Sequence, residues 1–526
     1  MPAVVSQAKG NIVDSNDESQ VIEGFPFFFY EIKKPVLPEN ERLMLSALTQ
    51  ILQGKKPDEL SAEKERGIIP SGFFSELNKE VFSKGFFRFG GSKLLSFQEI
   101  EELSSMLEKL LATFFPKLQS KDFIAKTAVD NVFGYGFAGV LLRDKELEEI
   151  MVNGYGFDVF VFHRRYGMCK ANIVVDEKQL DNLIQRIAFT ANKSFGENAP
   201  FLDARLLGGN RVNATFSSVT PFGPTLTIRK FTTTPLSIVD LLANRTLSSE
   251  LAAFLWVMVE GMNVQPMNTI ITGGSGCGKT TTLNVLSFFV RHSDRVVTIE
   301  DALELDLGSH DNWVRMETKP KIMDSPEVTM NDLLKNSLRM RPDRIVLGEV
   351  RSEEAQTLFV AMDTGHDGSM GTLHANNSKE AILRMTSPPM SVPESMISLL
   401  DLIVVQNRFY VKGKGMLRRV SQVAEVSSME RKALVGTLFE WDRKTDEIKR
   451  TDVPSRLMEE LADRLQVTKK EIMREITVRK KILEFLLEEK ITSNVEVEKI
   501  IQQYYYNPES VLELVVKQSG DVEEDE

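Results

Sequence analysis

The chain of 526 residues has little cysteine and no long apolar run. Its two cysteines, Cys169 and Cys277, are too few for a disulfide framework or for a zinc site of four thiolates. The longest apolar stretches, such as residues 251–259, have about half the length that a membrane-spanning helix needs. The N-terminal segment lacks the basic-then-apolar layout of a signal peptide. We therefore expect a cytoplasmic protein that reaches a membrane only through partners.

Positive charge is also in deficit. Lysine and arginine number 64 against 75 aspartates and glutamates, which gives a net charge of −11. Proteins that coat nucleic acid carry the opposite balance, so nucleic acid is not expected as a partner. The hydrophobic content of 42% and charged content of 26% are ordinary for a globular protein, and this length suggests about three domains.

Residues 273–280 (GGSGCGKT) fit the G-x-x-x-x-G-K-[ST] pattern of a phosphate-binding loop. The apolar segment 267–272 before the loop predicts a buried strand, and the mostly apolar segment 281–291 behind it predicts a helix. Glycines let the backbone turn several N–H groups toward an anion, and the start of the helix adds partial positive charge. The residues predicted to bind ATP are Gly273, Gly274, Ser275, Gly276, Cys277, Gly278, Lys279, Thr280 and Thr281.

Three side chains of the loop have distinct expected roles. Lys279 would reach the β- and γ-phosphates of ATP, and the Thr280 hydroxyl would ligate Mg²⁺. Cys277 is interpreted as a small filler, because the backbone rather than the side chain meets the phosphate at that position.

Two predicted strands end in carboxylates that could serve hydrolysis. Residues 344–348 lead to Glu349, and a second strand ends at Glu300, with Glu304 one turn further on. The usual acidic strand has an aspartate before the glutamate, but Gly348 stands there in this chain, so we expect Glu349 to contact Mg²⁺ through water. We assign the general base to Glu349 with support from Glu300, while Glu304 stays an alternative.

Histidines and arginines provide weaker signals. His366 and His374 lie eight residues apart in a glycine-rich segment without a nearby cysteine, which favours phosphate sensing over a zinc site. Arg205, Arg211 and Arg229 lie outside the nucleotide-binding segment. Such arginines can stabilise transition-state charge from another domain or subunit, although solvated strand arginines fit the pattern equally well.

Composition and periodicity also divide the chain. Strand and helix patterns alternate around the loop, which predicts an α/β fold with a mostly parallel sheet. The expected divisions are a mostly helical, partner-specific region at 1–112, an α+β domain at 113–232, a linker at 233–235, the nucleotide-binding core at 236–430, a hairpin with helices at 431–520, and an acidic tail at 521–526.

Four sequence boxes together resemble the secretion ATPases of the type II/type IV class. They are the phosphate loop, an aspartate-rich box at 296–305 (VVTIEDALEL), an acidic strand at 339–351 (RMRPDRIVLGEVR) and a histidine box at 364–376 (TGHDGSMGTLHAN). The hairpin at 438–447 and the helix at 479–492 resemble the archaeal branch, which includes the archaellum motor and assembly ATPase and its pilus relatives. The resemblance covers about residues 110–515.

This resemblance implies a fold, a cofactor set and partners. Each subunit of a homohexamer would have an N-terminal domain, a RecA-like P-loop core and a helical C-terminal extension, and would use ATP and Mg²⁺. Hydrolysis would drive domain movements against a polytopic membrane platform protein and archaellum or pilus accessory proteins, at the inner face of the cell membrane. The family's arginine contacts would fall on Arg211 and Arg229, then Arg205, and its sensor histidines on His366 and His374.

Assembly of an archaeal filament, with the archaellum favoured, is the function that we expect. A pilus or secretion ATPase without a link to motility is an alternative, as is a DNA-transport ATPase, against which the acidic net charge argues. A nucleotide-dependent scaffold without hydrolysis is the third reading. Its weakness is that it would not need Glu300 and Glu349.

Overall fold

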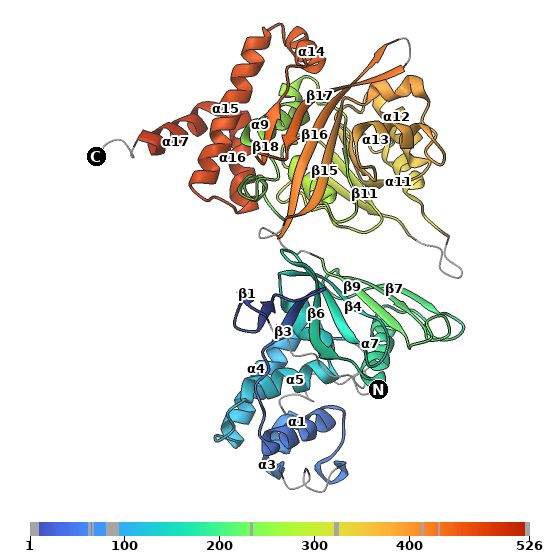
Figure 1. The fold of residues 1–526 in the computed structure, drawn as a ribbon, viewed down its shortest axis with the longest axis vertical. Coiled ribbons are helices and arrows are strands. Elements are labelled where there is room, and N and C mark those ends of the chain that lie inside the picture. The colour runs from blue at the N-terminus through green and yellow to red at the C-terminus, as the bar shows by residue number, and fades with distance from the viewer. Residues whose placement is uncertain are drawn as a thin grey trace. The chain divides into compact units, whose positions relative to one another are not determined.

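The computed structural model describes residues 10–61, 65, 68–79, 94–231, 235–319, 326–411, 415–429 and 432–520. The chain divides into two compact units, residues 1–233 and 234–526. Each unit contains one sheet with nine strands in the described part of the chain (Figure 1). Most of the expected linker at 233–235 and all of the acidic tail at 521–526 lie outside the described residues.

The sheet of the first unit has the strand order β1-β2-β3-β6-β5-β4-β9-β8-β7. Neighbouring strands pair antiparallel except β3 and β6, which are parallel. The strands are β1 (Ile12–Ser15), β2 (Ser19–Ile22), β3 (Phe28–Ile32), β4 (Leu147–Val152), β5 (Asp158–His163), β6 (Gly167–Val174), β7 (Phe201–Arg205), β8 (Arg211–Thr215) and β9 (Thr225–Arg229). The helices are α1 (Glu39–Leu52), α3 (Ser71–Leu77), α4 (Phe97–Phe114), α5 (Lys121–Val132), α6 (Gly139–Arg143) and α7 (Glu177–Thr190).

The first 112 residues do not form a helical region of their own, which corrects the expected division. The strand β3 pairs with β6, so β1, β2 and β3 extend the sheet of the following segment. One hydrophobic core joins Leu48 of α1 and Leu107 of α4 to Ile150 of β4. The physical reason is that β3 buries Tyr30 and Ile32, and a strand with a buried face needs a sheet partner.

The sheet of the second unit has the order β12-β11-β13-β14-β10-β15-β16-β17-β18. The strands from β12 to β15 in this order are parallel, and β15 to β18 continue the sheet antiparallel. Their bounds are β10 (Thr269–Thr272), β11 (Val296–Glu300), β12 (Trp313–Glu317), β13 (Arg344–Val350), β14 (Met370–Leu373), β15 (Leu402–Val411), β16 (Gly415–Met429), β17 (Lys432–Asp442) and β18 (Glu447–Arg450). The α/β alternation predicted from the sequence is confirmed.

Helices cover both faces of this second sheet (Figure 1). Ile270 and Ile271 are consecutive in β10 and point to opposite faces, because side chains alternate along a strand. Ile271 lies in the core with α9, α10, α15 and α16, whereas Ile270 lies in the core with α11, α12 and α13. The helices are α8 (Ile238–Ala243), α9 (Ser249–Glu260), α10 (Lys279–Ser287), α11 (Met330–Ser337), α12 (Glu354–Asp363), α13 (Ser378–Thr386), α14 (Arg456–Leu465), α15 (Lys469–Glu488), α16 (Asn494–Tyr506) and α17 (Pro508–Gly520).

The C-terminal segment belongs to the same unit as the nucleotide-binding segment, so the expected boundary near residue 430 is also corrected. The antiparallel pairs β15–β16 and β16–β17 carry the sheet across that boundary. The predicted hairpin and the helices after it are present as β17, β18 and α14 to α17. None of the helices in the described ranges is long and apolar enough to cross a membrane.

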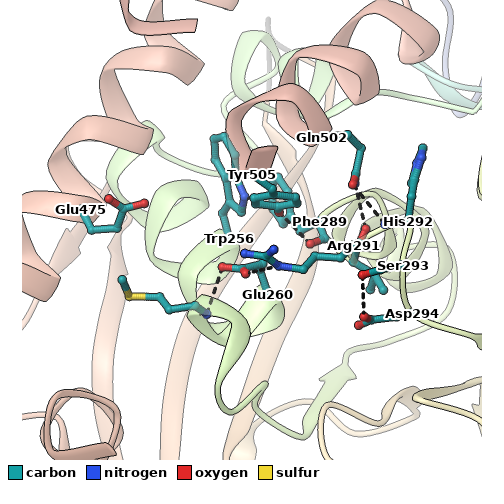
Figure 2. Close-up of polar contacts among 12 residues, drawn as sticks. Trp256, Glu260, Phe289, Arg291, His292, Ser293, Asp294, Glu475, Gln502 and Tyr505 are labelled. Atoms are coloured by element: carbon teal, nitrogen blue, oxygen red, sulfur yellow. Dashed lines mark hydrogen bonds and ion pairs between the residues drawn. The ribbon is translucent and has the colours of Figure 1, made fainter. Parts of the chain in front are cut away.

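A buried polar cluster fastens the C-terminal helices to the core (Figure 2). Glu260, at the end of α9, is fully buried and pairs with Arg291 at 2.6 Å and with Arg479 of α15 at 3.0 Å. The Trp256 indole donates a hydrogen bond to the Tyr505 hydroxyl at 2.6 Å. Such a cluster is costly to break from one side, because a buried charge would lose its partner.

Candidate nucleotide-binding site

The phosphate loop joins the carboxyl end of β10 to the start of α10, in the predicted strand–loop–helix order. Gly276 and Gly278 have φ values of 66° and 97°, which lie in the left-handed region that favours glycine. Gly278 is also the N-cap residue of α10, so the first turn of the helix opens directly onto the loop. Backbone N–H groups at such a helix start bind anions.

Lys279 is buried, and its ammonium group donates hydrogen bonds to the carbonyls of Gly273 and Gly274, both at 3.0 Å. The charge therefore lies at the loop itself, where phosphate oxygens could take over from the carbonyls. Thr280 and Thr281 are half-buried at the start of α10. Cys277 is buried, and burial raises the pKa of its thiol, so it lies in the loop as a neutral group.

Glu349, the residue before the last one of β13, lies beside the guanidinium of Arg351 and the imidazole of His374. Its carboxylate accepts a hydrogen bond from Arg351 at 2.7 Å, and His374 Nε2 lies 3.5 Å from its other oxygen. Burial favours the neutral form of the carboxyl, but Arg351, His374 and Lys279 outweigh it and hold the pKa of Glu349 below its ordinary value. Glu349 is therefore an ionised carboxylate at neutral pH.

Glu300, at the end of the neighbouring strand β11, has the opposite environment. It is 1% exposed, and burial raises the pKa of its carboxyl to about 7 although two backbone N–H groups donate to it. These donors are Glu304 at 2.7 Å and Leu305 at 2.8 Å, and the other Glu300 oxygen has no hydrogen-bond partner among the described residues. Environments that push two carboxyl pKa values apart are typical of acid–base pairs. Glu304 contributes its backbone to this arrangement.

The structure gives a steric reason for the missing aspartate at position 348. A Cβ atom on Gly348 would lie 3.1 Å from the Glu300 Cγ atom, which is a tight contact. Glu300 therefore occupies the space into which an aspartate at 348 would extend.

The two predicted sensor histidines lie at opposite ends of β14. His374 follows the carboxyl end of β14, which is the end that carries the phosphate loop, because Thr272 pairs with Leu373 in the parallel register. His366 precedes the amino end, where its ring bonds the Ala361 carbonyl at 3.2 Å. His366 therefore lies at the end of β14 away from the phosphate loop of its own chain, and its phosphate-sensing role stays a prediction.

Arg205, Arg211 and Arg229 form one row across the sheet of the first unit. Arg205 pairs with Arg211 between β7 and β8, and Arg211 pairs with Arg229 between β8 and β9. Directly opposite residues of antiparallel strands share a face, so the row presents three cations on one side. Glu149 on β4 follows next to Arg229, with the charged atoms 4.0 Å apart.

Sequence reasoning did not single out several residues near the loop. The Arg351 guanidinium contacts Glu349 at 2.7 Å and Asp301 at 3.5 Å, so it bridges the two carboxylates. In the sequence, Arg351 is only the last residue of the acidic strand box at 339–351 and has no signal of its own. Gln406 of β15 accepts a hydrogen bond from Thr282 of α10 at 2.7 Å and carries no sequence signal. A cavity of about 300 Å³ beside the site is lined by Glu349, Val350, Arg351, His374, Arg384 and Met390.

The sequence profile of the family described as "Type II/IV secretion system protein" matches residues 140–498, more than half of the chain. The chain belongs to the type II/IV secretion system protein family. Its phosphate loop and acidic strands make this family member an ATPase.

Individual relatives of this type II/IV secretion ATPase span archaea and bacteria. An uncharacterized protein of Methanocaldococcus jannaschii is 32% identical, with 72% of this chain and 76% of the relative covered. A putative conjugal transfer protein of Mycobacterium tuberculosis is 34% identical, with 40% and 60% covered. Two solved structures are also similar in part. They are the VirB11 ATPase of the Brucella suis type IV secretion system (24% identity, 54% and 90% covered, TM-score 0.28) and the Legionella pneumophila ATPase DotB (18%, 71% and 92%, 0.39).

Proposed function

We propose that this type II/IV secretion ATPase hydrolyses ATP to power the assembly of an archaeal type IV pilus-like filament. The archaellum is the favoured filament, and in that case the ATPase would power its rotation as well. The observation that carries the hydrolytic part is the pair of acids at the ends of β11 and β13. One of them, Glu349, is held ionised, and the other, Glu300, is shifted toward its neutral form. A scaffold that only binds nucleotide would not need this difference.

The residues around the loop fit ATP and Mg²⁺. The left-handed glycines and the buried Lys279 ammonium suit a β- and γ-phosphate, and the Thr280 hydroxyl with ionised Glu349 suits a hard cation. Thr280 would hold Mg²⁺ directly and Glu349 through water, and the ion would neutralise charge on the phosphates. Glu349 then orients the attacking water and accepts its proton, while Arg351 and His374 fix the carboxylate.

Mechanical work requires that hydrolysis depend on domain position. The row of Arg205, Arg211 and Arg229 lies on a separate unit from the loop, and three adjacent cations suit the charge that develops on a transferring phosphate. In a homohexamer, closure of one domain on another would complete the site. ATP favours the closed state only through its higher affinity for that state. The work would act on a membrane platform protein at the inner face of the membrane.

A related DNA-transport ATPase is a second candidate, because several relatives are named conjugal transfer proteins, including that of Mycobacterium tuberculosis. The net charge of −11 argues against it, since a DNA channel needs basic surface. A pilus or secretion ATPase without a link to motility is a third, and it differs from the main proposal only in the filament.

The decisive experiment compares ATP turnover of the wild type and Glu349→Gln, with mass from light scattering in the presence of a slowly hydrolysed ATP analogue. Lost turnover with retained nucleotide-dependent hexamers would support the motor. Unchanged turnover would move the base to Glu300 or Glu304. No turnover in the wild type, even with lipid and platform protein, would favour the scaffold. The Glu349→Gln change in the native host then distinguishes between the archaellum and a pilus. Loss of swimming in cells that still form pili supports the archaellum.

A further inference from the structure

The β15–β16 hairpin lies beside the phosphate loop, on the side away from the acids. In the sheet, β10 has β14 as one neighbour and β15 as the other. The strands that carry Glu349 and Glu300 lie beyond β14, and His374 follows β14 itself. Hydrolysis requires the γ-phosphate to face the acids. The nucleoside end of a bound nucleotide is therefore directed toward the hairpin.

Two arginines of the hairpin reach the loop. Arg418 Nε of β16 donates a hydrogen bond to the Gly276 carbonyl at 3.1 Å. A Cβ atom on Gly276 would lie 2.8 Å from Arg408 Nη1 of β15, so this glycine leaves room for the guanidinium. Both cations thus border the loop whose N–H groups and Lys279 attract phosphate.

The register makes these two arginines a matched pair. Arg408 lies directly opposite Arg418 in the antiparallel β15–β16 ladder, so both side chains project from the same face. The planar guanidinium also suits bidentate contact with phosphate oxygens.

The next pair along the same face is apolar and aromatic. Tyr410 lies opposite Met416, two residues further from the loop, a step of roughly 7 Å along a strand. The Tyr410 side chain is 56% exposed. An exposed aromatic ring beside a phosphate-binding pair suits stacking of a nucleobase.

The opposite face of the hairpin has a structural role instead. Phe409 stacks on Trp441 with ring centroids 4.7 Å apart, and Arg419 is buried in an ion pair with Asp446 at 2.8 Å. Arg443 lies over the Phe409 ring at 5.2 Å on this same covered face. The hairpin therefore offers one face to the loop and uses the other for packing, which supplies a matched control residue.

We propose that the loop-facing side of this hairpin forms the nucleoside half of the nucleotide site. Arg408 and Arg418 bind the α-phosphate and ribose end of ATP or ADP, and Tyr410 stacks on the adenine. The inference rests on ATP binding at the phosphate loop and adds residues that determine nucleotide affinity and base preference.

Calorimetric titration of the full chain with ADP and with inorganic triphosphate tests this assignment. Arg408→Ala and Arg418→Ala should each weaken ADP binding about tenfold, or about 1.4 kcal/mol. Tyr410→Ala should weaken ADP about fivefold and leave inorganic triphosphate unchanged, and Tyr410→Phe should restore ADP binding. In turnover assays the KM for ATP should rise with kcat retained, as expected for loss of uniform binding.

Arg443→Ala is the control. Arg443 lies in the turn between β17 and β18, which packs on the covered face of the hairpin, so this change removes the same charge away from the loop and should leave ADP affinity unchanged. Arg408→Lys keeps the charge and should recover part of the ADP affinity. This variant distinguishes loss of the phosphate contact from a folding defect. Wild-type ADP affinity in the Arg408, Arg418 and Tyr410 variants, with binding lost in Lys279→Ala, would overturn the hairpin assignment and leave the ATP site standing. Absence of ADP binding in the wild type would overturn both.

Discussion

Replacing Glu300 with glutamine should change how the stability of the chain depends on pH. Burial raises the pKa of the Glu300 carboxyl to about 7 from an ordinary value of 4.5. Between these values the folded chain binds more protons than the unfolded chain. Its contribution to stability is therefore complete below the lower value and is lost as the pH rises through the upper one. At about 1.36 kcal/mol per pKa unit, the loss amounts to about 3 kcal/mol.

The assay is urea unfolding of the wild type and Glu300→Gln at about pH 5 and about pH 8. The wild-type slope has a second source, because burial also raises the pKa of Asp401 to about 7. Only the difference between the two proteins reports Glu300. Because part of the contribution is already lost at about pH 5, the variant should lose about 2.5 kcal/mol less than the wild type between the two pH values. If Glu300→Gln kept the wild-type slope, the carboxyl would be ionised when folded, and the acid–base division at the site would be refuted.

Three further changes test other contacts. Gly348→Asp should crowd Glu300 and lower the free energy of unfolding in urea by about 1–3 kcal/mol, and Gly348→Ala should lower it less. If Gly348→Asp were as stable as the wild type, the steric reason for the glycine would be removed. Arg351→Ala should raise the pKa of Glu349, because the guanidinium that stabilises the carboxylate is lost. The acidic limb of the plot of kcat/KM against pH should then move to higher pH. If this limb did not move, the result would count against Glu349 as the base. Arg479→Met should cost about 1.5–3 kcal/mol, because the buried Glu260 keeps Arg291 as a partner but loses the charged hydrogen bond from Arg479. A loss no larger than that of truncating an exposed lysine on the same helix would contradict this.

The parts of the fold that follow from local signals were predictable from the sequence. The loop between β10 and α10 carries its own motif, and the apolar strands β11 and β13 end at the acids that the sequence indicated. The strand β12 was missed because it lies at the sheet edge with partly exposed side chains, so it has no buried run. The pairing of β3 with β6 was missed because it joins segments far apart in the chain.

The same distinction explains the candidate site. Glu349 and Glu300 could be proposed because each ends a recognisable strand, whereas their different pKa values come from Arg351 and from burial, which only the fold supplies. The register of a long hairpin brings Arg408 and Arg418 together, and no spacing rule indicates that register.

The segment that follows the phosphate-loop helix has a consequence for how force would leave the site. Residues 288–290 come directly after α10, which ends at Ser287, and side chains of α16 bind their carbonyls (Figure 2). The Gln502 amide donates to the carbonyls of Phe288 at 3.3 Å and Val290 at 2.8 Å, and the Tyr505 hydroxyl donates to that of Phe289 at 2.8 Å. These three hydrogen bonds connect the segment at the far end of α10 to α16. A displacement of α10 on nucleotide binding would therefore move the C-terminal helices as well.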